Sequence, residues 1–374
     1  MTIRMSLMLL AAAGATQAAV ANNIHVCPTC AHTTIQSAVD DAASNDLIVI
    51  AAGRYHENVT IQGKSLTLQG SDVLAGVTEV AAAGRGPVFT LGSAVNGAPA
   101  QVVVLNNLTI SGGSHFGGTG EGGGVQVRSG AYLQLVNSIV TRNLATRGAG
   151  VSINSPGSPA SSFTGCQIIN NWANGTLYPT GGPGGGVLVA AGSRLSIHNS
   201  IITHNISSDG GGVFTDVNTQ LSVNDSNISN NTSQPYPAPD GSPTAGGGGG
   251  LETSGAFDIV GTTLNNNLAL GPSGGGGALL NLHAGEDHFI SASIVARNNT
   301  RLGNNPAEGI AAGVLANTVD SPVQTITLVS DYIVENLQFG GLWLVGAELN
   351  SNNTTVADNI GGQICSSITS SCTP

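Results

Sequence analysis

Residues 184–187, Gly-Gly-Gly-Val, and residues 195–205, Leu-Ser-Ile-His-Asn-Ser-Ile-Ile-Thr-His-Asn, decide the fold of this 374-residue chain. A glycine cluster precedes a short apolar strand, and alternating apolar residues then lead to a final asparagine. The same pattern recurs at intervals of 26 to 38 residues. Self-similarity at such a period predicts a solenoid in which each repeat forms one coil. The apolar residues that follow the glycine clusters are Val125, Val151, Val187, Val213, Leu251, Ala278, Val314 and Leu342.

Each repeat ends in an asparagine, which we expect to stack on the asparagine of the next coil. Stacked amides can bond one another and the turn backbone, and this satisfies buried polar groups. We therefore assign these asparagines a structural role. The ladder consists of Asn143, Asn171, Asn205, Asn231, Asn267, Asn298, Asn336 and Asn359.

A second column marks a bend six residues before each asparagine. Its members mostly tolerate a left-handed backbone, and they are Asn137, Gly165, Asn199, Asp225, Gly261, Ala292, Ser330 and Asn353. The residue after each bend is small and usually carries a hydroxyl group. Cys166 occupies this position between Ser138 and Ser200, so we expect a packed thiol rather than a nucleophile.

Together these columns predict an all-β fold, a single right-handed parallel β-helix of about 10–12 coils. Each coil has too few apolar residues to form a core alone, whereas stacked coils align them in continuous columns at roughly 4.8 Å per coil.

Composition excludes several classes of protein. The net charge is −11 with only 10 Lys and Arg residues, which argues against a nucleic-acid partner because little would neutralise phosphates. Only 8% of residues are charged. Even so, no apolar run beyond the N-terminus reaches the roughly 18 residues of a spanning helix, so no transmembrane segment is expected after signal removal.

Residues 1–21 are typical of a secretory signal, with Arg4, a short apolar stretch and Ala19-Val20-Ala21 as a cleavage site. The mature chain is then secreted, periplasmic or at the cell surface, where disulfides persist. We expect Cys27–Cys30 and Cys365–Cys372 to close small loops at the two ends. A CxxC pair can also be redox-active or half of a zinc site, but no second pair and no thioredoxin-like context is present.

Residues 35–42 have helical spacing, with Thr34 as the N-cap. The helix and the strands after it, through residues 55–61 and 64–70, resemble the N-terminal cap of β-helix proteins of the pectin-lyase-like superfamily. Such a helix would cover the open end of the first coil. We therefore divide one domain into residues 22–104 for the cap and first coils, 105–360 for the regular repeats and 361–374 for the tail.

The glycine clusters and the apolar-x-x-Asn endings of residues 105–360 resemble the repeats of polymorphic outer-membrane proteins. This resemblance implies a bacterial surface protein of the adhesin type, with a glycan or a protein as its ligand.

Long connections alternate with short ones between the asparagine and the next glycine cluster. They cover residues 111–121, 172–183, 232–245 and 299–310, and we expect loops that project from one edge every second coil, about 9–10 Å apart. Two interpretations remain open: the loops form a ligand groove, or they cover the outward apolar residues Leu188, Phe214, Leu279, Leu315 and Trp343. The candidate ligand-binding residues are His115, Phe116, Glu121, Trp172, Tyr178, Tyr236, Asp240 and Arg301.

The resemblance to pectin-lyase-like enzymes implies a set of acidic residues on one outer face: calcium-binding carboxylates in pectate lyases and close aspartates in polygalacturonases. The outward column after the glycine clusters holds one carboxylate, Glu252. The column before the ladder asparagines is acidic only at Glu335 and Asp358. Two further groups match no family motif, namely Asp209 with Asp216 and His204, and Glu286-Asp287-His288.

The sequence therefore predicts an exported, non-enzymatic β-helix that binds a glycan or a protein and needs no metal or cofactor. The alternative is a polysaccharide lyase or glycoside hydrolase of the pectin-lyase-like superfamily, with calcium in the lyase case.

Overall fold

The computed structural model describes residues 21–71, 78–92, 100–117, 120–157, 159–174, 182–234, 246–271, 274–300, 311–319, 323–337, 340–360, 362–366 and 371–372. The predicted signal segment, apart from Ala21, lies outside these residues.

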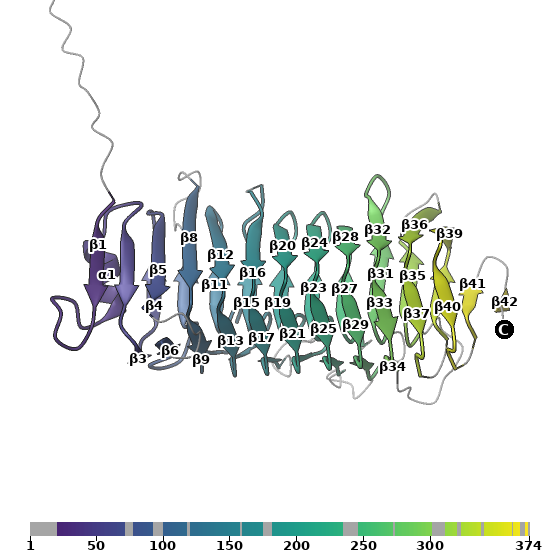
Figure 1. Ribbon diagram of the computed structural model, residues 1–374, viewed down its shortest axis with the longest axis horizontal. Coiled ribbons are helices and arrows are strands. Elements are labelled where there is room, and N and C mark those ends of the chain that lie inside the picture. Colours follow the sequence, from purple (N-terminus) through teal and green to yellow (C-terminus); the bar gives the residue numbers. More distant parts are fainter. Residues whose placement is uncertain are drawn as a thin grey trace, which may run out of the picture.

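The described chain forms a right-handed parallel β-helix with one short helix, and its coils follow one another along the long axis (Figure 1). Each regular coil runs through sheets A, B, D and C in that order. The predicted fold class is confirmed, since the two largest sheets each hold 12 strands within the described residues.

Sheet A consists of β1 (Asn23–Val26), β2 (Leu47–Ile50), β5 (Leu66–Gly70), β8 (Gln101–Asn106), β12 (Ala131–Val136), β16 (Ser161–Thr164), β20 (Arg194–His198), β24 (Gln220–Asn224), β28 (Ala256–Val260), β32 (His288–Ser291), β36 (Gln324–Val329) and β39 (Ala347–Asn352). Sheet B consists of β3 (Gly53–His56), β6 (Thr78–Ala81), β9 (Thr109–Ser111), β13 (Ile139–Thr141), β17 (Gln167–Ile169), β21 (Ile201–Thr203), β25 (Asn227–Ser229), β29 (Thr263–Asn265), β33 (Ile294–Ala296), β37 (Tyr332–Val334) and β40 (Thr355–Ala357).

Sheet C consists of β4 (Val59–Ile61), β7 (Phe89–Leu91), β11 (Val125–Val127), β15 (Val151–Ile153), β19 (Val187–Val189), β23 (Val213–Thr215), β27 (Leu251–Thr253), β31 (Ala278–Leu282), β35 (Val314–Thr318), β38 (Leu342–Val345), β41 (Ile364–Ser366) and β42 (Ser371–Cys372). Sheet D consists of β10 (Ser114–His115), β14 (Leu144–Ala145), β18 (Trp172–Ala173), β22 (Ile206–Ser207), β26 (Thr232–Ser233), β30 (Leu268–Ala269) and β34 (Asn299–Thr300).

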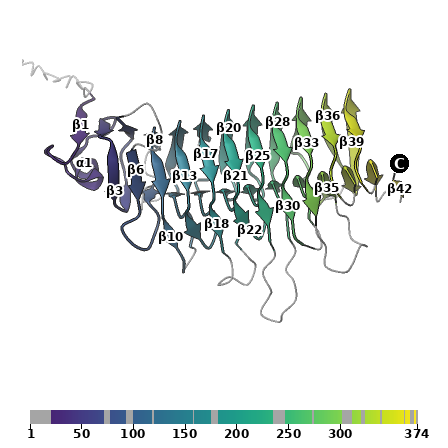
Figure 2. The same cartoon turned by 60° about the horizontal axis from the view of Figure 1, so that its bottom comes forward.

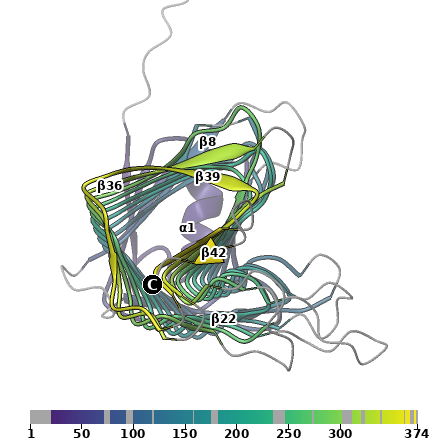
Figure 3. The same cartoon turned by 90° about the vertical axis from the view of Figure 1, so that its right-hand side faces the viewer.

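Sheets A, B and C enclose the core, which Figure 3 shows end-on as superimposed coils. Valine, isoleucine and leucine point inward from equivalent positions, so each fills the space above its counterpart in the coil below. One such column is Val140, Ile168, Ile202, Ile228, Leu264, Val295 and Ile333, all buried. Burial of about 25 cal/mol per Å² of apolar surface stabilises the stack.

The helix α1 (Ile35–Asp41) covers the N-terminal end of this core, as predicted. The Oγ1 atom of Thr34 accepts a hydrogen bond from the Ser37 amide at 3.2 Å, which is the N-cap contact. Ile35 and Ala38 pack into the core, and both oxygens of Glu57 accept amides from the first turn. No helix in the described part of the chain is long and apolar enough to cross a membrane.

The ladder asparagines form one buried column of hydrogen bonds. Each side-chain amide donates to the Oδ1 atom of the next asparagine at 2.9–3.1 Å. Each side-chain amide also donates to a carbonyl of the preceding coil, as Asn205 does to Ile168 at 2.8 Å. Gln363 completes the column, because its Oε1 accepts from Asn359 at 2.9 Å.

The glycine clusters leave space for the asparagine column and for the backbone of sheet D. A Cβ on Gly186 would lie 3.1 Å from Nδ2 of Asn205, and a Cβ on Gly185 would lie 2.6 Å from the carbonyl oxygen of Ile206. Larger residues would therefore separate the cluster from the ladder and from sheet D.

The bend column adopts the left-handed backbone that its residue types favour, with φ of 44–64°. Behind it lies the predicted hydroxyl column, in which Cys166 is buried and its amide donates to Oγ of Ser200 at 3.1 Å. Burial raises the pKa of the Cys166 thiol to about 11, which keeps it protonated and unreactive at neutral pH.

Sheet D was not expected, and it corrects the prediction that residues 111–121, 172–183, 232–245 and 299–310 are loops throughout. The first two residues of the last three connections form β18, β26 and β34, and residues 114–115 of the first form β10. Figure 2 shows this sheet along the lower edge of the solenoid. A Cβ on Gly211 would lie 2.6 Å from the carbonyl oxygen of Thr232 in β26, and a Cβ on Gly276 would lie 2.7 Å from that of Asn299 in β34. Glycine at the second position of these two clusters therefore leaves room for β26 and β34.

One predicted disulfide is present, between Cys27 and Cys30, with an S–S distance of 2.08 Å. The backbones of Cys365 and Cys372 lie opposite each other in the antiparallel pair β41–β42. Their side chains lie outside the described structure, so this second disulfide stays a prediction.

Candidate functional site

Four of the eight predicted ligand-binding residues are described, so the predicted site stays a prediction. The Nδ1 atom of His115 bonds the Glu121 carbonyl at 2.7 Å, and the buried Glu121 carboxylate pairs with Arg147 at 3.3 Å. Phe116 and Trp172 are 40% and 42% exposed and stand at the ends of β10 and β18, two coils apart. Tyr178, Tyr236, Asp240 and Arg301 lie outside the described residues.

The outward apolar residues of sheet C are covered in part. Leu188 is fully buried, and Leu279, Ala311 and Leu315 form a small cluster with Trp343.

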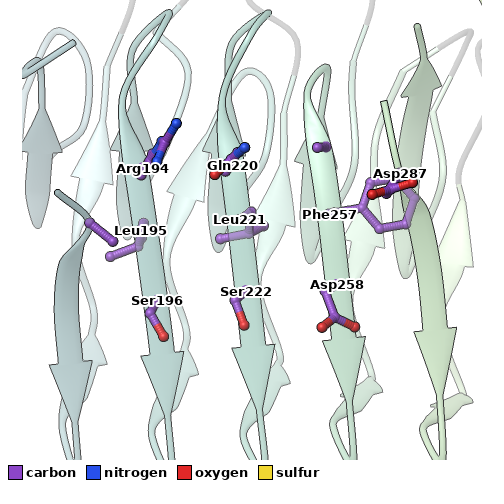
Figure 4. Close-up of a pocket in the computed structure, with 11 residues that line it drawn as sticks. Arg194, Leu195, Ser196, Gln220, Leu221, Ser222, Phe257, Asp258 and Asp287 are labelled. Atoms are coloured by element: carbon purple, nitrogen blue, oxygen red, sulfur yellow. The ribbon is translucent and has the colours of Figure 1, made fainter. Parts of the chain in front are cut away.

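A depression of about 350 Å³ lies instead on the outer side of sheet A, across β16, β20, β24 and β28. Figure 4 shows Arg194, Gln220 and Asp287 toward one end of the strands and Ser196, Ser222 and Asp258 further along them. A second depression of about 370 Å³ adjoins it, since Phe257, Asp258 and Asp287 line both. We call the two together the sheet A groove.

The groove follows from strand register. Ser162, Ser196, Ser222, Asp258, Phe289 and Thr327 are paired neighbours in successive strands. Parallel pairing places them in one row at intervals of about 4.8 Å. The row therefore presents a hydrogen-bonding side chain in every coil except that of Phe289.

The charges of the groove are unevenly placed. Arg194 lies on β20, and the exposed residues Asp258 and Asp287 lie on β28 and before β32. Neither aspartate forms a salt bridge within the described residues.

His288 lines the second depression and is 5% exposed. Its ring centroid lies 5.3 Å from that of Phe257. Burial lowers the pKa of His288, while the nearby charge of Asp287 acts in the opposite direction. The Nε2 atom forms no hydrogen bond within the described structure and lies 3.9 Å from a carboxylate oxygen of Glu286.

A pair of carboxyl groups lies at the start of sheet C. Asp209 accepts the Gly247 amide at 3.1 Å and Glu252 accepts the next amide, of Gly248, at 3.3 Å. The Ser208 hydroxyl also donates to Asp209 at 2.8 Å. A Cβ at residue 247 would overlap the Glu252 carboxylate, so a larger residue there would displace this carboxyl group.

The two carboxyl groups differ in proton affinity. Burial, followed by repulsion from Asp209, raises the pKa of Glu252 to about 8. Burial raises the pKa of Asp209 to about 6. Glu252 is therefore largely protonated and Asp209 largely ionised at neutral pH, which is the arrangement of an acid and a base.

Sequence reasoning missed this pair because its members are 43 residues apart. The signal was register: Asp209 directly precedes the glycines 210–212 of one coil, and Glu252 lies two residues after the glycine run 246–250 of the next. The Asp216 carboxylate accepts the Val217 amide at 2.9 Å and His204 bonds Thr203. Within the described residues, no three His, Cys, Asp or Glu side chains form a group that could hold a metal ion.

Solved structures with similar folds include enzymes whose titles name pectin, pectate or a polysaccharide. A mannuronic acid specific family 6 polysaccharide lyase from human gut microbiota is 8% identical, with 92% of this chain and 78% of that chain covered and a TM-score of 0.43. The pectate lyase Pel9A is 14% identical, with coverage of 92% and 81% and a TM-score of 0.39. Pectin methylesterase from Aspergillus niger is 12% identical, with coverage of 82% and 88% and a TM-score of 0.35.

At these identities the likeness concerns the fold alone. No curated protein matches the sequence. Residues 93–286 match the family described as the right-handed beta helix region, and this segment contains strands β8 to β31. The chain therefore belongs to the right-handed β-helix family.

Proposed function

We propose that this chain is an exported protein that binds a glycan in the sheet A groove without cleaving it. The observation that carries the proposal is the row of outward side chains across β16 to β36, one for each coil. An extended glycan laid along the solenoid axis would meet a serine or threonine hydroxyl group in four of these six coils and Asp258 and Phe289 in the other two. Binding sites of this kind combine an apolar surface with a few fixed polar groups.

The groove supplies both kinds of contact. Ser196, Ser222 and Gln220 offer hydrogen bonds on neighbouring strands, and Phe289 stands in the same row. Because the strands are held by parallel pairing on both sides, the side chains keep their spacing when no ligand is bound, which lowers the entropy cost of binding.

Export is part of the proposal. The signal-like residues 1–21 and the Cys27–Cys30 disulfide both favour an oxidising compartment. The expected location is secreted, periplasmic or at the cell surface.

Blocking the groove tests the proposal. Ser222→Tyr places a ring in the row, and binding to a panel of soluble polysaccharides is measured by affinity electrophoresis and calorimetry. We expect at least about tenfold weaker binding, equal to about 1.4 kcal/mol. Gln167→Tyr, on the exposed face of β17 in sheet B, is the matched control and should bind as the unchanged protein does. Equal binding by both variants would contradict the proposed site.

The Asp209–Glu252 pair favours a second candidate function, a polysaccharide lyase or hydrolase with an acid and a base at sheet C. The test is release of reducing ends or unsaturated products from acidic and neutral glycans, with and without calcium. The enzymatic function would be favoured over glycan binding by turnover that depends on this pair. Asp209→Asn and Glu252→Gln should then each abolish the turnover, and Ser222→Tyr should leave it unchanged.

A further inference from the structure

We infer that the first coils of sheet B form a binding site for a phosphate ester, between Arg54 on β3 and Arg142 directly after β13. Figure 1 shows these strands at the N-terminal end of the solenoid. The site lies on a different sheet from the sheet A groove, so it goes beyond the proposed function and does not depend on it.

The first observation is that two guanidinium groups share one carboxylate. The Nε atom of Arg54 lies 3.3 Å from Oε2 of Glu79, and Nη2 of Arg142 lies 3.9 Å from Oε1 of the same residue. The arginine side chains are 58% and 70% exposed, whereas that of Glu79 is 19% exposed. Within the described residues, no second acidic group pairs with either arginine. The site therefore keeps an excess of positive charge at the surface.

Strand register brings these groups together from distant parts of the chain. Arg54 and Glu79 are paired neighbours in β3 and β6. In the next coil the Ser111 hydroxyl group donates to Oε1 of Glu79. The coil after that supplies Arg142, whose carbonyl accepts the Gly112 amide. The carboxylate is thus fixed by the protein, and it orients both guanidinium groups before a ligand arrives, which lowers the entropy cost of binding.

The second observation is that hydrogen-bond donors remain available. Two guanidinium groups carry more N–H donors than one carboxylate can accept. The contact of Arg142 with Glu79, at 3.9 Å, is also too long for a hydrogen bond. Exposed ion pairs of this kind add little to stability. A further anion can therefore bind both groups without displacing Glu79.

Arg297 shows an equivalent arginine whose charge is already matched. It stands at the position of Arg142 in a later coil, directly before a ladder asparagine, and both residues have a φ of 55°. The Nε atom of Arg297 donates to Oε2 of Glu335 at 2.8 Å, so this arginine has a carboxylate of its own in the next coil. Within the described structure, Arg142 has only the shared Glu79.

The shape of the anion follows from the placement of the donors. A planar carboxylate pairs best with one guanidinium group, through two parallel hydrogen bonds. A phosphate group directs its oxygens around a tetrahedral centre, so it can bridge the two arginines, which contact different oxygens of Glu79. A phosphate ester can come from a sugar phosphate or from a lipid headgroup, and the probes below distinguish these sources.

The charge of the whole chain is compatible with a single phosphate. The net charge is −11, but charges beyond about 8 Å are largely screened at physiological salt. The local excess of positive charge therefore decides. A nucleic acid would need many such contacts, whereas one phosphate group needs only Arg54 and Arg142.

The experiment measures binding of glucose 6-phosphate, inorganic phosphate and glucuronate to the full mature chain by calorimetry in phosphate-free buffer. Both phosphates should bind, and glucuronate should bind at least about fivefold more weakly. Arg54→Gln and Arg142→Gln should each weaken the binding of glucose 6-phosphate by about five- to tenfold. Circular dichroism checks that both variants keep the fold.

Arg297→Gln is the matched control, because it removes the same charge at the equivalent position of another coil. It should change the affinity less than twofold. Equal losses in Arg297→Gln and Arg142→Gln would overturn the inference, since net charge alone would then explain them. Equal affinity for glucuronate and glucose 6-phosphate, or no binding of either phosphate probe together with no binding to the vesicles below, would also overturn it.

Vesicles of phosphatidylcholine with and without phosphatidic acid identify the source of the phosphate. Binding to the phosphatidic acid vesicles that Arg142→Gln removes supports the site and assigns it to a lipid headgroup if glucose 6-phosphate binds more weakly than the vesicles do. Tighter binding of glucose 6-phosphate assigns it to a sugar phosphate. Ser222→Tyr should leave phosphate binding unchanged, so failure of this site and failure of the glycan groove are separate results.

Discussion

Two columns of hydrogen bonds run along this solenoid, and they differ in how much variation they accept. The asparagine column is invariant through eight coils, whereas the column behind the bends holds serine, threonine, cysteine and aspartate. The difference lies in the number of bonds each residue makes. Asn205 accepts the Asn171 amides with Oδ1 and donates through Nδ2 to two acceptors. Ser200 accepts one amide and donates to one carbonyl.

A side chain that accepts hydrogen bonds with one atom and donates two with another must carry an amide group. The asparagine side chain has the length to reach both neighbours. A single hydroxyl group has several substitutes. A repeat position is therefore invariant where its side chain makes several hydrogen bonds that no other residue can make. Burial alone does not produce this invariance, since both columns are buried.

The largest expected effect is at the invariant column. Asn205→Asp keeps the shape but removes both donors, so the carbonyl of Ile168 and Oδ1 of Asn231 face a carboxyl group. Oδ1 of Asn231 keeps the backbone amide of residue 205, but both oxygens lose their side-chain donor and face a buried carboxyl group. This change should lower the free energy of unfolding by about 3 kcal/mol or more. Urea unfolding followed by circular dichroism measures this loss. Gln167→Asn, on the exposed face of sheet B, should change it by less than about 0.5 kcal/mol. A small loss for Asn205→Asp would show that the column is not rigid.

An intermediate effect is expected at Asp331, the ionisable member of the variable column. Its Oδ1 atom accepts the Ser293 amide at 2.8 Å, while Oδ2 is buried without a hydrogen bond. Burial raises the pKa of Asp331. The folded state therefore holds this proton more tightly than the unfolded state, and stability falls as pH rises from the ordinary value of about 3.9.

Asp331→Thr supplies the hydroxyl group found at Thr262 and Thr354 in the same column. We expect it to stabilise the protein by about 1 kcal/mol at pH 7, with the gain shrinking toward pH 4. Thermal unfolding of both proteins across that range is the measurement. A gain that is equal at both ends would mean that ionisation of Asp331 is not the cause.

Much of the fold could be predicted because the same residue types recur at equivalent positions of each coil. The spacing of Val125, Val151 and Val187 gave the coils, and Thr34 gave the start of the capping helix. Sheet D could not be predicted, since strands of two residues such as Trp172–Ala173 are too short to show alternation. The resemblance to polymorphic outer-membrane repeats stays a prediction.

The candidate site was harder to predict for a physical reason. The groove is made by Ser196, Ser222, Asp258 and Asp287, which come from different coils and meet only when the strands are aligned. A one-residue error in register would turn each of them to the other face. His115 and Glu121 were chosen for their residue types, yet their polar atoms bond within the protein.

The smallest effect is expected at Cys166. Replacing it tests whether a thiol and a hydroxyl group stabilise the variable column equally well. Its sulfur lies 3.2 Å from the Leu135 carbonyl and 3.3 Å from that of Thr164, the second matching the bond of Ser200 to the carbonyl two residues earlier. Cys166→Ser should therefore change the free energy of unfolding by less than about 1 kcal/mol. The native thiol, whose pKa burial raises to about 11, should react with a disulfide reagent only at the rate of unfolding. Labelling within seconds in the native state would show an accessible thiolate and restore Cys166 as a candidate nucleophile.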